Sequence, residues 1–528
     1  MKTKSWLIAL GGTASLLAPL TATAQTPERA VSAARFIDSI GINAHWGYGG
    51  SRYADRYPQV KRLLIASGIR HVRGDLSRAQ DLAASGIKTM AVADIDTRYT
   101  HFPAFAPADG NDDTIRGVLA NIKKANAPLP AIDSVEGPNE TDHFWTLFQK
   151  SYKGHGWRPK RADETQDAYD KAVLLGIIQG TIGFQTDLYH ALKADPATRN
   201  MMVLGPALGG TYAPNTIPNP MPAGSLTGAV DWGNFHPYPY GGNFDGYGGS
   251  YDTIVAPHDY THAGNFPSDS MDRDDKGSPF AALAFVSYAP PFAPKPMAAS
   301  ETGYPTHRSG SSERAQGKYL PRLFCEYFTH GVQRTFWYEL MDEDEFPDPN
   351  GDNIECHYGI IRKDLTPKPA YTALKSLLTL LSDPRPAPAF TPAALPYSLS
   401  VRPVRGYTEP NSGMVLDYDR TQYVHHLLLQ KSDGTFYLLL WHEIADEDTS
   451  VKPHRQIQPP AMPATITLPP SIAAATVYAY DKAEVLQPTV GVISGGRLQV
   501  NVPDQVLVVR LSPRRAQTTP KRPKRRAR

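Results

Sequence analysis

The sequence predicts a (β/α)8 (TIM) barrel followed by a C-terminal β-sandwich domain. Eight short apolar runs alternate with stretches of helical periodicity between residues 36 and 382. After residue 382 the pattern changes to the period-two alternation of antiparallel strands. Between its two unusual ends the chain has about 490 residues, enough for a barrel and one smaller domain.

The first 24 residues have the pattern of a secretory signal peptide. Lys2 and Lys4 provide a positive start, residues 6–20 are apolar, and residues 22–24 (Ala-Thr-Ala) form a small-x-small cleavage site. The apolar run is short for a membrane span, and no later stretch reaches about 18 uncharged apolar residues. We therefore expect cleavage of residues 1–24, a secreted or periplasmic protein and no stable membrane insertion; an uncleaved anchor is the alternative.

The predicted barrel covers residues 25–382. Its strands are short continuous apolar runs, as expected for strands buried on both faces; they are residues 40–44, 69–72, 89–93, 132–135, 202–205, 232–236, 297–300 and 335–338. Helices are predicted at residues 58–66, 113–125, 165–194, 314–329 and 369–381, whereas residues 206–230 and 240–290 contain too much Pro and Gly for a helix prediction. A doubly wound open sheet is the alternative, but no Gly-x-Gly-x-x-Gly motif opens a helix after the first strand.

The β-sandwich is predicted at residues 391–512, after a Pro-rich linker at 383–390. An Asp-Gly turn at residues 432–434 joins two alternating runs, which is a strong hairpin pattern. The strands predicted here are residues 425–430, 436–441, 464–468, 475–480, 492–502 and 505–511. We expect this domain to pack against the barrel, with independent sugar binding as the alternative.

The basic character of the chain comes from its C-terminal tail. Residues 513–528 carry eight Lys or Arg, no acid and three Pro, a composition that predicts disorder. Removing these eight charges and those of Lys2 and Lys4 from the formal +2 leaves about −8 for the rest of the chain. The folded part therefore lacks the basic face that nucleic-acid binding needs. We expect a solvated tail; contact with an anionic envelope polymer is the alternative.

The chain has only two cysteines, Cys325 and Cys356. In an oxidising compartment they are able to pair, but spacing alone does not show whether their Cα atoms come within reach. Without a His-rich cluster they do not predict a zinc site, and the sequence suggests no metal and no other cofactor.

Two glutamates stand at the ends of predicted barrel strands. Glu140 follows the fourth strand and Glu301 ends the seventh. Barrel active sites lie at the C-terminal ends of the strands, and cleavage of a glycosidic bond requires a carboxyl group on each side of the anomeric carbon. A charge at a strand end is costly unless it is used or paired, so the pair predicts a glycosidase site; a salt bridge that caps the barrel is the alternative.

The motifs around these glutamates resemble those of the retaining glycoside hydrolases of clan A, over residues 40–382. Asn139-Glu140 matches the Asn-Glu pair that ends strand four in the clan, and residues 300–306 (Ser-Glu-Thr-Gly-Tyr-Pro-Thr) resemble a stretch of the family that holds β-1,3-glucanases. His-Pro-Tyr at residues 236–238 matches the clan's His-x-Tyr on strand six. The clan's strand-two arginine and strand-eight aromatic have counterparts in Arg73 and Trp337.

The resemblance implies a role for each matching residue. Glu140 is the expected acid/base and Glu301 the expected nucleophile, while Asn139 is expected to contact the sugar 2-hydroxyl. The other matching residues expected to bind substrate are Arg73, His236, Tyr238 and Trp337. Outside the resemblance, Trp46 is expected at the floor of the site from its place after the first strand. Arg73 and Tyr238 are the expected donors to Glu301, and Glu136 is the competing acid.

The sequence thus predicts a secreted retaining glycoside hydrolase that acts on a β-linked poly- or oligosaccharide. The context of Asn139-Glu140 is not that of the cellulase-like families, and the β-domain is more like that of xylosidase- or iduronidase-type members, so the sugar is left open. Aromatic-rich loops at residues 141–163 and 240–262 are expected to shape the cleft. The alternatives are a catalytically silent polysaccharide-binding barrel and a transglycosylase that uses the same two glutamates.

Overall fold

The computed structural model describes residues 27–514 except 49, 96–107, 211–218, 239–286, 309, 345, 384–389, 412, 414, 419–420, 445 and 449–454. The predicted signal peptide, nearly all of the basic tail and the predicted loop at 240–262 lie outside the described residues, as does most of the predicted linker. Among the helices that the structure describes, none is long and apolar enough to cross a bilayer.

Eight parallel strands form the predicted barrel. In sheet order they are β10 (Met202–Leu204), β7 (Ile132–Glu136), β5 (Lys88–Val92), β4 (His71–Gly74), β3 (Ile40–Ala44), β13 (Thr335–Trp337), β12 (Met297–Thr302) and β11 (Gly233–Phe235). A parallel bridge between Leu204 and Trp232 links the two outermost strands, and Gly205 N donates to Trp232 O at 2.9 Å. Each predicted strand is present, so the barrel prediction is confirmed.

The outer helices lie where their periodicity predicts them, each end within one residue. They are α3 (Tyr57–Ser67), α6 (Asp112–Ala125), α8 (Gln166–Ala194), α11 (Glu313–Thr329) and α12 (Pro369–Leu381), with shorter helices α1 (Ala33–Asp38), α2 (Arg52–Asp55), α4 (Ala79–Ala83) and α7 (Thr141–Leu147). Side chains of Asn111, Thr165 and Ser312 cap α6, α8 and α11, which explains the sharp starts. The described residues between β10 and β11 form turns, as their Pro and Gly content indicates.

The C-terminal domain contains two packed antiparallel sheets. The larger includes β18 (Val424–Gln430), β19 (Phe436–His442), β27 (Leu507–Pro513), β23 (Ile472–Tyr480) and β24 (Leu486–Gly491). The smaller includes β15 (Ser398–Val401), β22 (Met462–Thr467), β26 (Arg497–Val502) and β25 (Ile493–Ser494), and short pairs such as β16 (Val404–Thr408) with β17 (Val415–Tyr418) flank both. Leucine, isoleucine and valine side chains from both sheets form one core between them, which confirms the predicted β-sandwich.

The N-terminal strands change the predicted domain boundary. β1 (Glu28–Arg29) pairs with β14 (Ala394–Leu395), and β2 (Val31–Ser32) adds in parallel to β18 of the larger sheet. These residues belong to the β-domain and not to the barrel predicted from residue 25. Two-residue strands carry no detectable period, and they form here only because the sheet edge offers unpaired backbone groups.

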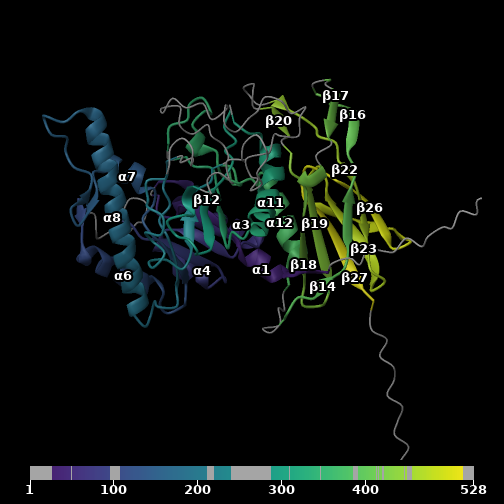
Figure 1. Cartoon of the computed structure of the whole chain (residues 1–528), viewed down its shortest axis with the longest axis horizontal. Helices are drawn as coiled ribbons and strands as arrows, with labels where there is room; N and C mark the ends of the chain where they lie inside the picture. The colour runs from purple at the N-terminus through teal and green to yellow at the C-terminus, as the bar shows by residue number, and fades with distance from the viewer. Residues whose placement is uncertain are drawn as a thin grey trace, which may run out of the picture.

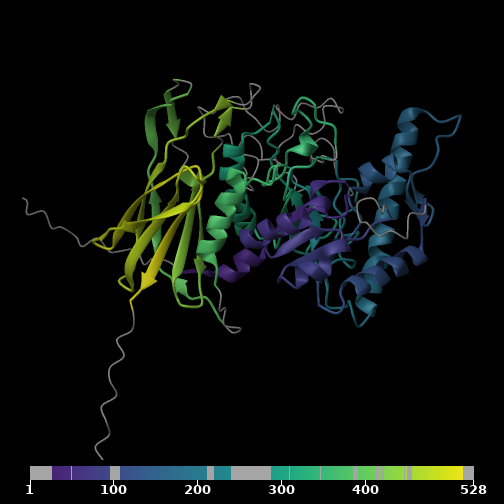
Figure 2. The same cartoon turned by 180° about the vertical axis from the view of Figure 1, so that it is seen from behind.

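Helix α11 contacts the β-domain through buried polar side chains, and Figures 1 and 2 show it with α12 between the barrel and the β-sheets. Lys318, Arg322 and Glu326 lie four residues apart on one buried face. Lys318 Nζ lies 2.9 Å from Asp446 Oδ2, and Trp441 Nε1 donates to Glu326 Oε2 at 3.0 Å. This buried polar seam and the continuous apolar core support the predicted packing role of the β-domain.

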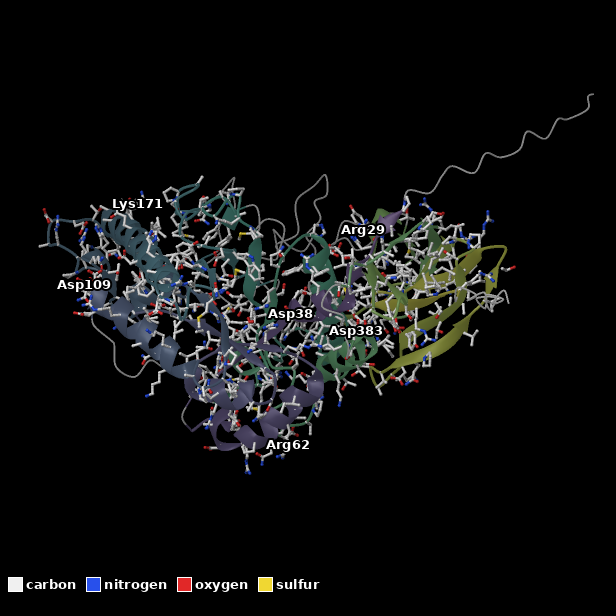
Figure 3. All side chains as sticks on the ribbon, turned by 90° about the horizontal axis from the view of Figure 1, so that it is seen from below. Arg29, Asp38, Arg62, Asp109, Lys171 and Asp383 are labelled. Atoms are coloured by element: carbon white, nitrogen blue, oxygen red, sulfur yellow. The ribbon has the colours of Figure 1, made fainter. Side chains whose placement is uncertain are left out.

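At the opposite end, α8 and the small sheet of β6 (Asp109–Gly110), β8 (Ser151–Tyr152) and β9 (His155–Gly156) extend away from the β-domain. Asp109 and Lys171 mark this end in Figure 3, far from Asp383. The molecule is therefore elongated, with the barrel in its middle.

Cys325 and Cys356 are both free and buried, so the disulfide considered from the sequence does not form. Cys325 lies in the fourth turn of α11, roughly 18 Å along a helix that runs away from the C-terminal ends of the strands. Cys356 lies in the loop after β13, at the C-terminal ends, where its Sγ is 3.6 Å from Phe346 O.

Candidate active site

The structure brings Glu140 and Glu301 together at the mouth of the barrel. One carboxylate oxygen of each, together with a ring nitrogen of His236, lie within 4.8 Å of one another. Glu301 is 8% exposed and the Glu140 side chain 17% exposed, so both are largely withdrawn from water while a face of each remains accessible. The predicted pair therefore shares one small space.

Local irregularities of the backbone direct the side chains of both glutamates toward the mouth of the barrel. The ladder between β12 and β13 shifts register between Ala299 and Thr302, so that Ser300 and Glu301 both contact residues of the barrel interior. Glu140 has φ 42°, a left-handed conformation that is rare for a residue with a side chain. Its N–H donates to Ala207 O at 2.9 Å, which anchors this strained residue on the neighbouring strand end.

Arg73 from β4 ties the site together. Its Nη1 donates to Glu301 Oε1 at 2.6 Å and to Asn43 Oδ1 at 3.0 Å. Its Nη2 donates to Asn139 Oδ1 at 2.7 Å and to Glu136 Oε1 at 3.0 Å. A planar guanidinium with several fixed donors suits such a buried junction, so one side chain orients the nucleophile candidate and the residue beside the acid candidate.

His236 bridges the two glutamates. Its Nδ1 lies 2.7 Å from Glu140 Oε1 and 3.7 Å from Glu301 Oε2, and its Nε2 lies 2.8 Å from Ser300 Oγ. Burial lowers the pKa of the imidazole, but Glu301, Glu136 and Glu140 outweigh that effect and raise the pKa to about 10. This shift favours the protonated imidazole, in which both ring N–H groups donate, one to Glu140 and one to Ser300.

The environments of the two glutamates push their pKa values apart. Burial raises the pKa of Glu140, and the negative charge of Glu301 adds to this rise against the opposing hydrogen bond from His236. Burial also raises the pKa of Glu301, but the charges of His236 and Arg73 and the Tyr238 hydroxyl outweigh it, so the net shift is downward. One carboxyl group thus tends to keep its proton while its neighbour is ionised, which is how two carboxyl groups divide acid and nucleophile roles.

The remaining contacts of the site involve Tyr238 and Asn139. Tyr238 Oη donates to Glu301 Oε2 at 2.6 Å, as expected for a donor to this carboxylate. Asn139 N donates to Asp94 Oδ2 at 2.9 Å, and Asp94 Oδ1 accepts from Trp145 Nε1 at 2.9 Å. Asp94 thus positions the backbone next to Glu140.

Glu136, the competing acid, is fully buried and cannot reach a substrate. It accepts from Arg73, from Asn234 Nδ2 at 3.1 Å and from Ser300 Oγ at 3.0 Å. Burial raises the pKa of Glu136, but the effects of Arg73 and His236 outweigh burial and lower the pKa to about 2. Glu136 is a permanent anion beneath the site that holds Arg73 in place.

Trp337 and Trp46 are not brought to the site. Trp337 is completely buried and stacks on Tyr304 with ring centroids 6.1 Å apart. Strand alternation explains this position: Phe336 points into the barrel and Trp337 outward to the helices, so that the next residue, Tyr338, faces the mouth. Trp46 is 2% exposed, also within the outer core.

Tyr338 is the aromatic residue that the predicted register missed. Its ring lies 6.0 Å from that of Tyr238 and 5.2 Å from that of Tyr358. Glu355 was missed as well: burial and the charges of Glu343, Glu301 and Glu140 raise its pKa to about 7. No motif marks Glu355, which lies in a short 3-10 helix (Ile354–Cys356) after β13.

Fold and site together define a (β/α)8 barrel with paired carboxyl groups at the C-terminal ends of its fourth and seventh strands. This is the arrangement implied by the resemblance to clan A glycoside hydrolases. No family model and no curated protein matches the sequence.

Among solved structures the chain is similar to a family 39 glycoside hydrolase from the gut symbiont Bacteroides cellulosilyticus WH2, with a TM-score of 0.49 and 14% identity over 91% of this chain and 82% of that one. It is also similar to a family 51 α-L-arabinofuranosidase from Bifidobacterium longum, with a TM-score of 0.49 and 14% identity over 92% and 98% of the two chains. A third similar structure is that of a family 39 enzyme from Xanthomonas axonopodis pv. citri, with a TM-score of 0.49 and 14% identity over 94% of this chain and 100% of that one. At these scores the likeness carries no argument about activity, which rests on the site.

Proposed function

We propose that this protein is an exported retaining glycoside hydrolase that cleaves a β-linked poly- or oligosaccharide by double displacement. The observation that carries the proposal is that a carboxylate oxygen of Glu140 lies within 4.8 Å of a carboxylate oxygen of Glu301. Retaining enzymes hold their two carboxyl groups about 5 Å apart, whereas inverting enzymes leave room between them for a water molecule. The opposite pKa shifts of the two groups support the same division of roles.

In the first step the Glu301 carboxylate attacks the anomeric carbon and forms a glycosyl ester as the glycosidic C–O bond breaks. The Glu140 proton passes to the departing oxygen, and His236 remains hydrogen-bonded to the resulting carboxylate. In the second step Glu140 takes a proton from water, the water oxygen attacks the anomeric carbon, and the ester bond to Glu301 breaks. Asn139, held by Arg73, is placed to contact the sugar.

The proposal is tested by treating the mature protein with a set of 2-deoxy-2-fluoro glycosyl fluorides and mapping the adduct by peptide mass spectrometry. We expect a stable sugar on the peptide that contains Glu301. An adduct on a different carboxylate would overturn the nucleophile assignment. Absence of any adduct, together with no turnover of polysaccharides, would favour a barrel that only binds sugar.

A Glu140→Gln variant is expected to show a leaving-group dependence. With poor leaving groups kcat/KM should fall by about 10²–10⁴-fold, because no acid protonates the departing oxygen. With an activated aryl leaving group the first step should be nearly normal, and hydrolysis of the glycosyl-enzyme should become slow. Burst kinetics on two aryl glycosides of different leaving-group pKa measure this, and an equal loss on both substrates would argue against Glu140 as the acid.

The pH dependence of kcat/KM is expected to be bell-shaped. As pH falls through the lowered pKa of Glu301, the nucleophile becomes protonated and activity is lost. As pH rises through the raised pKa of Glu140, the acid loses its proton and activity is lost again. In Glu140→Gln, assayed with an activated substrate, the alkaline limb should disappear while the acid limb stays. An unchanged alkaline limb would assign it to another group.

A further inference from the structure

A second cluster of ionisable side chains lies beside the catalytic pair and takes no part in the proposed reaction. His45 follows β3, and Glu339 and Glu343 follow β13, so the first and last barrel strands converge here. His45 Nδ1 contacts Glu343 Oε1 and lies 3.6 Å from Glu339 Oε2. The ring nitrogen and one oxygen of each carboxylate lie within 4.8 Å of one another.

The two carboxylates of this cluster have few hydrogen-bond donors or cations to balance their negative charge. Glu339 is fully buried and Glu343 is 1% exposed. Among the described residues, Glu339 Oε1 and Glu343 Oε2 are buried oxygens with no hydrogen-bond partner, while the other oxygen of each carboxylate faces His45. A buried carboxylate oxygen without a donor or cation is costly, so two such oxygens in one cluster point to a missing positive ligand.

The supporting contacts resemble those around metal ligands. Tyr53 Oη donates to Glu339 Oε2 at 2.8 Å and accepts from Met341 N at 2.9 Å, which fixes the Glu339 carboxylate. Hydrogen bonds of this kind orient ligating carboxylates in metal sites.

We propose that His45, Glu339 and Glu343 form a binding site for a divalent transition-metal ion of the Zn²⁺ class. One imidazole nitrogen and two carboxylate oxygens make a three-ligand set that suits Zn²⁺ or Mn²⁺, whereas Ca²⁺ and Mg²⁺ prefer oxygen ligands alone. The sequence did not suggest this site, because 298 positions separate His45 from Glu343 and no ligand spacing is visible.

The site is placed to position the catalytic pair and not to react. The His45 ring lies 5.4 Å from that of Tyr338, which lies 6.0 Å from Tyr238, the donor to Glu301. A bound ion would fix the ends of β3 and β13 and so the wall of the mouth that Tyr338 forms. The inference does not depend on the proposed hydrolase activity.

The test uses the mature protein without a His tag, stripped with EDTA and titrated by calorimetry with Zn²⁺, Mn²⁺, Ca²⁺ and Mg²⁺. We expect saturable binding of Zn²⁺ and Mn²⁺ with a rise in Tm, and none of either for Ca²⁺ and Mg²⁺. Glu339→Gln and Glu343→Gln should each weaken Zn²⁺ binding at least about tenfold, since even the loss of supporting contacts costs 10–100-fold. Glu355→Gln is the matched control: it removes a carboxylate near the cluster that is not one of the three ligands, and this variant should bind Zn²⁺ like the wild type.

Two outcomes would overturn the proposal. Failure of the wild-type protein to bind Zn²⁺ or Mn²⁺ would mean that a shared proton satisfies the cluster. Zn²⁺ binding that neither variant weakens would place the ion at another group, such as Glu326, His425 and Glu443. If a Gln variant does not fold, the absorption spectrum of bound Co²⁺ is compared between the wild type and Glu443→Gln, which lacks a ligand of the other group. Bands of four-coordinate Co²⁺ in both proteins support the site; bands that disappear in Glu443→Gln, or a hexaaqua-like spectrum of the wild type, overturn it.

Discussion

A Glu301→Gln variant is expected to lose between about 10⁴- and 10⁶-fold in kcat, the range seen when a general base or nucleophile is removed. The amide is nearly isosteric but carries no negative charge, so the covalent intermediate cannot form. Arg73 Nη1 and Tyr238 Oη, which donate to the carboxylate at 2.6 Å each, would then face an amide. Steady-state rates with an aryl glycoside measure the loss.

A smaller side chain gives the matching control. In Glu301→Ala, azide should enter the vacated space, attack the anomeric carbon from the same side as the missing carboxylate, and yield a glycosyl azide of inverted configuration. In Glu140→Ala, azide should instead replace water in the second step and yield the retained configuration. NMR of the two products separates the roles, and rates within tenfold of wild type in Glu301→Gln would place the nucleophile elsewhere.

The fold could be predicted because each of its main strands and helices is marked by a local pattern in the sequence. Each barrel strand is a short apolar run, and the outer helices have clear periodicity with capping residues such as Asn111 and Ser312. The strands that escaped prediction lack such signals. β24 contains Pro488 and its middle is exposed to solvent, and β1 and β2 form only through pairing with a distant part of the chain.

The candidate site was predictable where position along a strand determines it. Arg73, Asn139, His236 and Tyr238 meet Glu140 and Glu301 because parallel strands deliver their C-terminal ends to one mouth. The prediction failed where it depended on strand register. A shift of one residue exchanges the inward and outward faces of a strand, and in β13 it is Tyr338, not Trp337, that faces the mouth of the barrel. The roles of Glu136 and the His45 cluster depend on contacts between distant residues, which no motif encodes.

Substitution of Arg73 by Met is expected to have the largest effect on stability. The change leaves Glu136 buried as an anion without its principal cation, and breaking a buried ion pair in this way costs about 3–5 kcal/mol. Activity should fall as well, since Glu301 loses a donor that favours its ionised form. By contrast Arg52→Met, which breaks an exposed pair with Asp344, should cost less than about 1 kcal/mol. Denaturant titration of both variants tests the difference.

A double variant separates the structural from the catalytic role of Arg73. In Arg73→Met/Glu136→Gln the uncompensated charge is gone, while Asn234 and Ser300 remain near the Glu136 position. Most of the lost stability should therefore return, but kcat should stay low because Glu301 and Asn139 still lack the guanidinium. If activity returned together with stability, Arg73 would act only as a counter-ion to Glu136. If neither returned, its contacts to Asn43 and Asn139 would carry the stability instead.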